Sequence, residues 1–327
     1  MVDTVYIESN IKNEKKTLEI ISKLGNVNIV NCEKYTEVFN KKSQNFRLQK
    51  LNPSLIIAKK NKNFVLKTPP KFSIGSKNNY YFSHMMNCIY DCRYCFLQGM
   101  YNSANYLIYI NYFDFKNEIE KVYLNSDSKD IHFFSGYDCD SLAFEPLTNL
   151  ADYFIDSFND FKRSLLELRT KSNQINFLLK KNPQENVIIA FSLNPESVIK
   201  NLEKKTPSLK KRLIAIKKLQ QKGWNVGLRF DPIIYTKDFK IEYSNFFEDV
   251  FNFLNNKFHS ITLGSYRMPK SFNHKISRLY PKNNLFKKNL IADKNFIKYD
   301  ECISDEINEF CQKEILKYVS KEILFFN

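Results

Sequence analysis

Residues 87–98, with the sequence NCIYDCRYCFLQ, constrain this chain more than any other segment. Cys88, Cys92 and Cys95 lie within eight residues at the spacing C-x3-C-x2-C. Three thiolates this close can bind three irons of an iron–sulfur cluster, and the iron without a protein ligand is then free to bind another molecule. Buried cysteines can also act as small apolar side chains, but the charged residues between these three do not suit a core segment.

A structural zinc site is the alternative metal centre. Zinc in such sites takes four Cys or His ligands, and His84 is the nearby residue that can complete the set. The chain has seven cysteines in all, an odd number with three of them clustered. This pattern argues against a disulfide framework and favours the reducing cytoplasm.

Length and charge narrow the class of protein further. A chain of 327 residues can form one large domain or two modest ones. It has no run of about eighteen apolar residues and begins without a secretory signal, so we expect a cytoplasmic protein with no membrane partner. Lys and Arg number 50 against 35 Asp and Glu, a net charge of +15. Such an excess is expected of a protein that binds a polyanion, although solvent-facing lysines alone can also produce it.

Strand-like and helix-like segments alternate along the chain. Apolar runs before the cysteines predict strands at residues 4–7, 27–30 and 55–58, and a helix at 17–24 that Gly25 ends. After the cysteines, strands are expected at residues 107–110, 131–134, 186–193, 225–230 and 260–264. Residues 164–171 are a candidate buried strand, although the length of this run does not separate it from a helix. Helices are expected at 115–124, 148–158 and 207–222, and residues 312–326 as a helix followed by an apolar tail. This alternation predicts βαβ units and an α/β fold with a largely parallel sheet.

About six such units follow residue 80, which suits an open or partial barrel. A proline pair and a glycine turn before residue 76 mark a seam in the chain. We therefore expect an N-terminal α/β extension at residues 1–75, the partial barrel at 76–290, and a C-terminal helical segment at 291–327 that packs on the barrel. Functional side chains of such barrels collect at the C-terminal ends of the strands. The residues expected there, facing one mouth, are the cysteine segment, residues 136–140, Lys171, Ser192 and Asp231.

A cysteine triplet at this spacing, followed by an α/β barrel, resembles the radical S-adenosyl-L-methionine (SAM) superfamily. The resemblance implies a partial (β/α)6-type radical SAM barrel and a 4Fe–4S cluster whose open iron binds SAM. One electron then cleaves SAM and releases a 5′-deoxyadenosyl radical. The radical chemistry belongs to the cofactor, while the protein supplies orientation and excludes side reactions.

Further motifs are similar to those of the spore photoproduct lyase family. They are CFLQ at 95–98, DSLAFEPLT at 140–148, LRTK at 168–171, FSLN at 191–194, VIKNLE at 198–203 and RLYP at 278–281. The similarity covers most of the chain. It implies a radical SAM carbon–carbon lyase that repairs a methylene-bridged thymine dimer, an ultraviolet photolesion in DNA. It also implies an electron donor such as flavodoxin or ferredoxin.

The resemblance assigns roles to six residues. They are the cluster ligands Cys88, Cys92 and Cys95, and the cofactor contacts Tyr94, Lys171 and Ser192. Lys171 can neutralise the methionyl carboxylate of SAM as a point charge, and Ser192 can donate a hydrogen bond to a cofactor oxygen. Taken singly, a solvated lysine and a serine bonded to its own backbone are the alternatives.

The hydrogen donor of the family is less clear in this sequence. The family's donor cysteine lies just upstream of an Asp-x4-Glu stretch, and aligning that stretch on Asp140 and Glu145 places Tyr137 at the donor position. Cys139, two residues later, is the candidate hydrogen donor, with a buried structural thiol as its alternative. The family also has a tyrosine directly after the third cluster cysteine, where this chain has Phe96. These departures favour a second hypothesis, a radical SAM enzyme that acts on RNA or on a protein side chain.

DNA contacts are predicted from position and resemblance. Arg267 and Lys270 follow an expected strand end and are the preferred phosphate contacts, while Lys298 and Tyr299 lie in a stretch similar to the family's DNA-contacting segment. The basic residues of 204–218 are expected to form a solvated helix face. A third hypothesis is a non-catalytic nucleic-acid-binding protein with a structural zinc.

Overall fold

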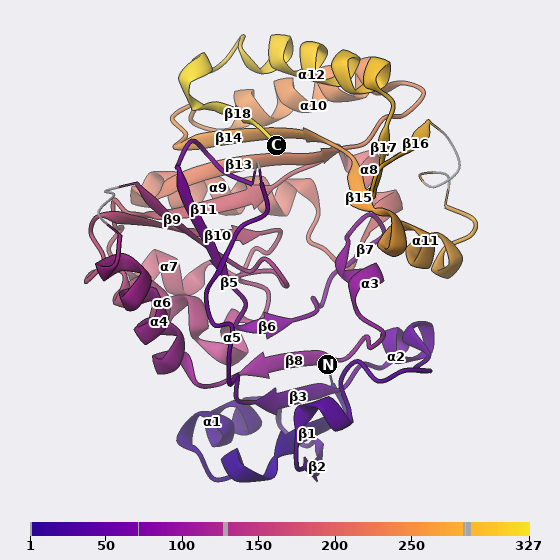
Figure 1. Ribbon diagram of the computed structural model, residues 1–327. Coiled ribbons are helices and arrows are strands. Elements are labelled where there is room, and N and C mark those ends of the chain that lie inside the picture. The colour runs from indigo at the N-terminus through magenta and orange to yellow at the C-terminus, as the bar shows by residue number, and fades with distance from the viewer. Residues whose placement is uncertain (1, 71, 127–129, 284, 286–288) are drawn as a thin grey trace.

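The computed structural model describes residues 2–70, 72–126, 130–283, 285 and 289–327. Its largest sheet has the strand order β18-β14-β13-β11-β10-β9-β5-β4 and curls into a half barrel (Figure 1). Its strands are β4 (Leu66–Lys67), β5 (Asn78–Phe82), β9 (Ile131–Ser135), β10 (Ser164–Thr170), β11 (Val187–Ser192), β13 (Asn225–Ile233), β14 (Ser260–Ser265) and β18 (Leu324–Phe326). Neighbouring strands are parallel except β4 and β5. The predicted α/β half barrel is confirmed.

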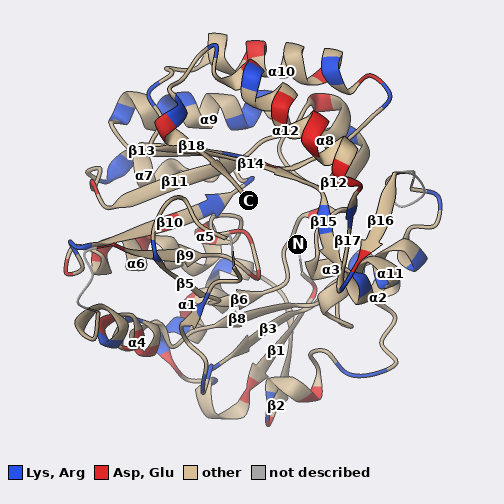
Figure 2. Ribbon diagram, turned by 45° about the horizontal axis from the view of Figure 1, so that its top comes forward, with Lys and Arg blue, Asp and Glu red and all other residues tan. Residues whose placement is uncertain are grey.

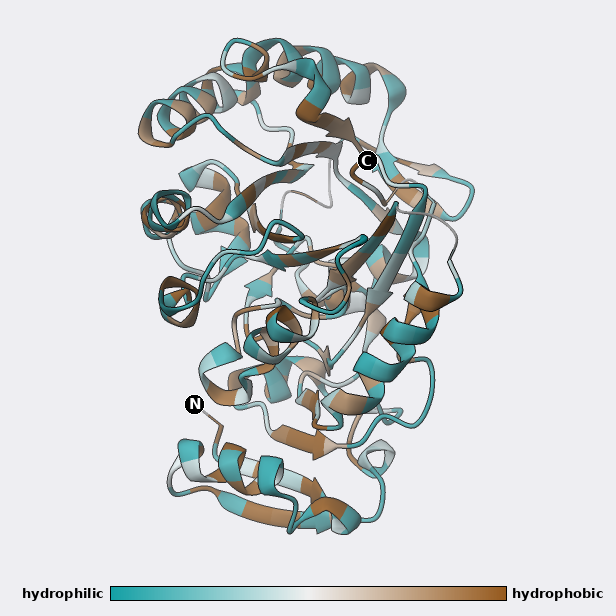
Figure 3. Cartoon of the chain, turned by 90° about the vertical axis from the view of Figure 1, so that its left-hand side faces the viewer, coloured by the Kyte–Doolittle hydropathy of each residue, from teal (hydrophilic) through white to brown (hydrophobic). Residues whose placement is uncertain are grey.

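Helices connect the strands and pack on the outside of the sheet (Figure 1). They include α4 (Tyr112–Leu124), α6 (Leu150–Ser157), α7 (Asn176–Lys180), α8 (Glu196–Leu202), α9 (Leu209–Lys222), α10 (Phe239–Phe253) and α12 (Glu301–Ile315). Apolar strands and teal outer helix faces are visible in Figure 3. In α9 the apolar face is buried as expected, the Ser208 side chain accepts a hydrogen bond from Lys211 N, and Gly223 ends the helix at φ +97°.

A second sheet lies below the half barrel, with the order β2-β1-β3-β8-β6 (Figure 1). Its strands are β1 (Thr4–Glu8), β2 (Asn28–Cys32), β3 (Leu55–Ala58), β6 (Met85–Met86) and β8 (Tyr106–Tyr109), accompanied by α1 (Lys15–Leu24), α2 (Phe46–Leu51) and the short α5 (Glu145–Thr148). The strand expected at 107–110 is β8, which pairs with β3 here rather than with the barrel strands. The first barrel strand is instead β5, which the sequence did not single out.

The end of the chain also differs from expectation. The helix begins at Glu301 rather than near residue 312, because the Asp300 side chain accepts a hydrogen bond from Ile303 N and caps it. The apolar tail is strand β18, which pairs with β14. The two sheets also cross both predicted boundaries. Strands β6 and β8, which follow residue 75, join the second sheet, whereas the half barrel includes β4 from before residue 75 and β18 from beyond residue 290. The division at residues 75 and 290 stays a prediction.

Short elements close the region where the barrel strands end. They are the antiparallel sheet of β15 (Arg267–Pro269), β16 (Leu290–Asp293) and β17 (Phe296–Tyr299), the pair β7 (Asp91–Cys92) and β12 (Glu203–Lys204), and helices α3 (Leu97–Met100) and α11 (Lys270–Leu279). Helix α11 packs so closely on α3 that a side-chain carbon added at Gly99 would lie 2.6 Å from Phe272 Cα. No helix in the described part of the chain is long and apolar enough to cross a membrane.

Candidate active site

The cysteine loop begins at a fixed turn. Asn87 adopts the left-handed conformation at φ +69°, and its buried amide donates to the carbonyl oxygens of Ser103 (2.7 Å) and Asn105 (2.8 Å). Lys50 Nζ donates to the Cys88 carbonyl oxygen at 3.3 Å. These bonds fix the backbone at the first of the three predicted cluster ligands.

The second cysteine is held by a short β-ladder. Strand β7 pairs antiparallel with β12, which places Cys92 opposite Glu203, and Arg93 N donates to the Leu202 carbonyl oxygen at 2.7 Å. The ladder joins the cysteine loop to the segment that follows α8. Residues about 110 positions apart in sequence are therefore adjacent at the site.

Side chains brace the loop from its other side. Gln98 Nε2 donates to Asp91 Oδ1 (2.8 Å) and to the Cys92 carbonyl oxygen (2.7 Å). The Tyr280 hydroxyl donates to Gln98 Oε1 at 2.5 Å. Gln98 and Tyr280 both belong to motifs quoted above, CFLQ and RLYP, so these motifs have a structural role in holding the loop.

The donor set fits an iron–sulfur cluster better than a single metal ion. All seven cysteines are free thiols, and no three or more Cys, His, Asp or Glu side chains of the described residues are grouped so that they could hold one metal ion. His84, the predicted fourth zinc ligand, has Nε2 3.7 Å from Cys139 Sγ. In a 4Fe–4S cluster each thiolate binds a different iron, so the three thiols need not meet. Burial raises the pKa of the Cys88 thiol to about 12, so a metal cation is needed to hold the thiolate form.

A buried carboxylate lies behind the cysteine loop. Glu203 accepts hydrogen bonds from the Tyr94 hydroxyl, from Arg212 Nη2 (2.5 Å) and from Asn194 Nδ2 (3.1 Å). Burial by itself raises the pKa of Glu203, but Lys171 and Arg212 outweigh it and lower the pKa overall. Arg212 is 0% exposed. The expectation that Arg212 belongs to the solvated face of α9 is therefore wrong, because its guanidinium neutralises this carboxylate.

The strand ends carry the other two predicted cofactor contacts. Lys171 follows β10, and its Nζ lies 5.5 Å from the centre of the Tyr94 ring. Asp140 fixes this position, since Asp140 Oδ2 accepts from Lys171 N at 2.6 Å and Oδ1 accepts from Thr170 Oγ1 at 2.6 Å. Burial lowers the pKa of Lys171, but nearby Glu203 and the cysteines raise it overall, so the side chain stays charged. Ser192 ends β11 and is buried, with its carbonyl oxygen 3.0 Å from Arg212 Nη1.

Phe96 and Tyr137, the two positions where this chain departs from the family pattern, pack against each other. The Tyr137 ring lies 5.5 Å from that of Phe96 and 4.5 Å from that of Tyr81, measured between centroids. Cys139 is 9% exposed. Burial, followed by the charges of Cys88 and of neighbouring carboxylates, raises the pKa of Cys139 well above its usual range. Cys139 therefore keeps its S–H hydrogen.

All four predicted DNA contacts lie on or beside the β15–β17 sheet. Arg267 and Lys298 are opposite each other across β15 and β17, and Lys270 begins α11. Arg267 is paired with Asp231 (3.1 Å) and Lys298 with Asp293 (2.8 Å). Both ion pairs are at least partly exposed, so phosphate can compete for these cations.

The fourth residue, Tyr299, ends β17, but its side chain is buried. Tyr299 is 1% exposed, and its hydroxyl accepts a hydrogen bond from Tyr235 N at 2.9 Å. The predicted DNA contact by Tyr299 is contradicted by this burial. The aromatic ring is instead part of the core beneath the small sheet.

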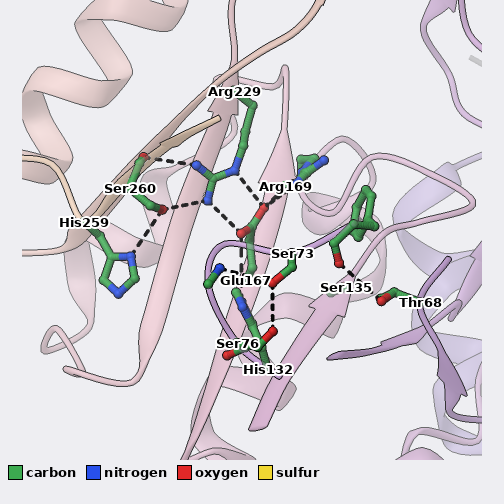
Figure 4. Close-up of polar contacts among 12 residues, drawn as sticks. Thr68, Ser73, Ser76, His132, Ser135, Glu167, Arg169, Arg229, His259 and Ser260 are labelled. Atoms are coloured by element: carbon green, nitrogen blue, oxygen red, sulfur yellow. Dashed lines mark hydrogen bonds and ion pairs between the residues drawn. The ribbon is translucent and has the colours of Figure 1, made fainter. Parts of the chain in front are cut away.

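A charged network inside the barrel was not expected from the sequence (Figure 4). Fully buried Glu167 accepts from Arg229 Nη2 (2.7 Å) and Arg169 Nε (2.9 Å). His132 stacks on Phe134 with ring centres 4.0 Å apart, and its Nε2 lies 3.9 Å from Glu167 Oε2. The sequence does contain a signal for this network. Glu167 and Arg169 are charged residues two positions apart in the otherwise largely apolar strand β10, so they lie on the same face of the sheet.

Buried His132 makes stability depend on pH. Burial lowers its pKa to about 3, against an ordinary value of about 6.5. Below pH 6.5 the unfolded chain therefore binds a proton that the folded chain does not, and the free energy of unfolding falls by about 1.4 kcal/mol per pH unit for this group. Equilibrium unfolding between pH 7 and pH 4 should show a shallower fall for His132→Leu than for the parent. His84, with a pKa also lowered to about 3 by burial, retains its own contribution.

Exposed His274 provides the control for that measurement. His274→Leu should keep the pH slope of the parent. Equal slopes for the parent and His132→Leu would contradict the assignment of a neutral, buried imidazole.

A parallel half barrel with a C-x3-C-x2-C loop and charged residues at its strand ends defines a radical SAM enzyme. The sequence model of the family described as spore photoproduct lyase matches residues 1–322. The chain belongs to the spore photoproduct lyase family. The 4Fe–4S cluster, SAM and the lyase class expected from the sequence are thereby confirmed.

Individual relatives agree with this assignment. The spore photoproduct lyase of Clostridium acetobutylicum is 26% identical over 253 residues, covering 74% of this chain and 75% of that protein. The Bacillus subtilis enzyme is 27% identical over 202 residues, covering 61% of this chain and 59% of that protein. A solved spore photoproduct lyase complexed with dinucleoside spore photoproduct superposes with a TM-score of 0.87 at 18% identity, covering 100% and 99% of the two chains. A variant with bound AdoMet and dinucleoside spore photoproduct gives 0.86 at 19%, covering 100% and 98%. These structures share the fold.

Proposed function

We propose that this enzyme repairs spore photoproduct, the methylene-bridged thymine dimer of ultraviolet-irradiated DNA, by direct reversal in the cytoplasm. The family match over residues 1–322 carries the proposal. When bound, the cluster and SAM supply the radical hydrogen abstraction that opens the lesion. A flavodoxin or ferredoxin is the proposed electron donor.

The cysteine loop and the strand ends hold the cofactors in this proposal. Cys88, Cys92 and Cys95 bind the cluster. Lys171 is charged and half-buried at the end of β10, so it can pair with the SAM carboxylate. Ser192 donates a hydrogen bond to SAM from the next strand. Tyr94 packs against the cofactor, because Glu203 fixes its hydroxyl and hence its ring.

Cys139 returns a hydrogen atom to the product in this proposal. Its raised pKa keeps the S–H bond intact, and its burial keeps other hydrogen sources away. Tyr137, two residues before Cys139 in the chain, is the alternative donor. Phe96 has no hydroxyl and packs on Tyr137, so Phe96 itself cannot supply a tyrosine hydrogen there.

Cys139→Ala tests the donor. The variant should still cleave SAM and consume the lesion, but the yield of clean thymine product should fall and side products should appear, because the product radical is quenched from elsewhere. Product analysis by liquid chromatography and mass spectrometry measures both. Exposed Cys302 provides a control variant, Cys302→Ala, with the parent's product pattern.

Tyr137→Phe completes that comparison. An unchanged product pattern in Cys139→Ala together with side products in Tyr137→Phe would move the donor role to Tyr137. Clean product from both variants would remove both residues from the mechanism.

The basic residues beside the small sheet contact the DNA backbone in this proposal. Arg267, Lys270 and Lys298 supply phosphate contacts, whose affinity falls steeply with salt. The lesion must leave the base stack to reach the strand ends, which costs less where damage has already weakened stacking.

The experiment for the function is anaerobic reconstitution with iron and sulfide, followed by SAM, dithionite and dinucleoside spore photoproduct. The expected product is the repaired thymine dinucleotide. Cleavage of SAM with the lesion left intact would reject the substrate and favour the RNA or protein alternative.

A further inference from the structure

A cleft of about 1060 Å³ lies beside the cysteine loop. Its walls come from the ends of α8 and α11, from β12 and from the segment after β13, with Arg47 of α2 at its edge. Figure 2 shows α2, α8, α11 and β12 on one side of the molecule. Arg93, which lies between the predicted cluster ligands Cys92 and Cys95, is one of the lining residues.

The cleft reaches the cluster loop through Arg93. The Arg93 guanidinium carbon lies 3.8 Å from the centre of the Tyr280 ring, and Arg93 Nη2 lies 3.2 Å from Asp91 Oδ2. Its backbone N–H is bonded to Leu202, another lining residue. A molecule in the cleft can therefore contact Arg93, the residue directly after the predicted cluster ligand Cys92.

The cleft is strongly basic. Its exposed cations are Arg47, Lys204, Lys237 and Lys282. None of these four forms an ion pair with a carboxylate among the described residues. Glu242 is the one acidic side chain among the described lining residues, and its Oε2 accepts from Thr236 Oγ1 at 2.6 Å. The surface is complementary to an acidic partner.

The proposed cofactor and catalytic residues are not part of the cleft. Lys171, Ser192, Tyr137 and Cys139 are not among the described residues that line the cleft. Phe96 packs towards Tyr137, whereas Arg93 packs towards Tyr280. A partner in the cleft would thus leave the opening for the lesion free.

We propose that this cleft docks the small acidic protein that delivers the electron to the cluster. The inference rests on the proposed function, because it assigns a place to the electron donor that this function requires. The carrier is oxidised by one electron and the cluster is reduced by one, and that electron is then used to break a C–S bond of SAM. DNA is the competing polyanion, but neither of the proposed catalytic residues, Tyr137 and Cys139, is among the described residues that line the cleft.

Charge reversal in the cleft tests the proposal, with reduced flavodoxin as the probe. The variant R47E/K237E/K282E is compared with K210E/K218E/K222E, which makes the same change in net charge on the exposed face of α9. The flavodoxin-driven rate of SAM cleavage at low salt should fall by about tenfold or more in the cleft variant, because charge complementarity controls association. The α9 variant should keep the parent's rate.

Dithionite separates docking from the rest of the enzyme. Because this reductant needs no docking, all three proteins should cleave SAM equally with it. Equal flavodoxin-driven rates in the cleft and α9 variants would overturn the proposal. So would a cleft variant that loses affinity for duplex DNA while its flavodoxin-driven rate stays at the parent's level. The rate of SAM cleavage needs no lesion, so a failure of the proposed repair reaction would be recognised separately, as intact spore photoproduct with dithionite.

Discussion

Cys92→Ala is expected to reduce cofactor cleavage to background. Cys92 is the buried member of the trio, and β7 fixes its backbone opposite Glu203. The variant leaves two thiolates for a cluster that this chain is expected to bind through three. Iron and sulfide content per chain after reconstitution, together with dithionite-driven release of 5′-deoxyadenosine, provide the measurement.

Cys302→Ala is the matched control, because Cys302 is exposed on α12 and far along the chain from the loop. It should bind the parent's amount of iron and cleave SAM at the parent's rate. Full iron content and turnover in Cys92→Ala would contradict the assignment of this cysteine to the cluster.

The second large effect is expected from Arg212→Met. Arg212 and Glu203 form a fully buried ion pair with Nη2 and Oε2 2.5 Å apart. Removing one partner of a buried pair leaves the other charge buried without a partner, which lowers the free energy of unfolding by about 3–5 kcal/mol. Chemical denaturation of the reconstituted protein measures this loss. SAM binding should weaken as well, because Arg212 orients Glu203 and Glu203 in turn holds the Tyr94 hydroxyl.

Two further variants show whether the unpaired charge of Glu203 causes the loss of stability. Lys211→Met changes an exposed lysine on the same helix and should alter stability by no more than about 0.5 kcal/mol. Adding Glu203→Gln to Arg212→Met removes the unpaired carboxylate and should recover part of the lost free energy of unfolding. A loss in Arg212→Met as small as that of Lys211→Met would refute the buried pair.

The parts of this protein that sequence predicts best are those with local causes. The cysteine spacing lies within eight residues, and apolar runs such as residues 187–192 predict buried strands without reference to the rest of the chain. The prediction that these side chains share one mouth of the barrel follows from topology, because parallel strands all end at the same edge of a sheet. Lys171, Tyr94 and Glu203 do meet there.

The parts that sequence missed depend on partners distant along the chain. The polar and aromatic residues of β5 form a strand because β9 pairs with them, while the more apolar β8 pairs with β3 instead. Arg212 has the sequence surroundings of a surface lysine cluster and is buried only because Glu203 lies opposite it. Likewise, the charge of Glu167 is tolerated in the barrel because Arg229 comes from another strand.

Transfer of deuterium from the lesion tests the central claim most directly. Reconstituted enzyme is incubated with SAM, dithionite and dinucleoside spore photoproduct carrying deuterium at the carbons open to abstraction, and 5′-deoxyadenosine is analysed by mass spectrometry. Radical repair at this site predicts deuterium in 5′-deoxyadenosine and the appearance of repaired thymine dinucleotide. Unlabelled 5′-deoxyadenosine with the lesion intact would contradict it.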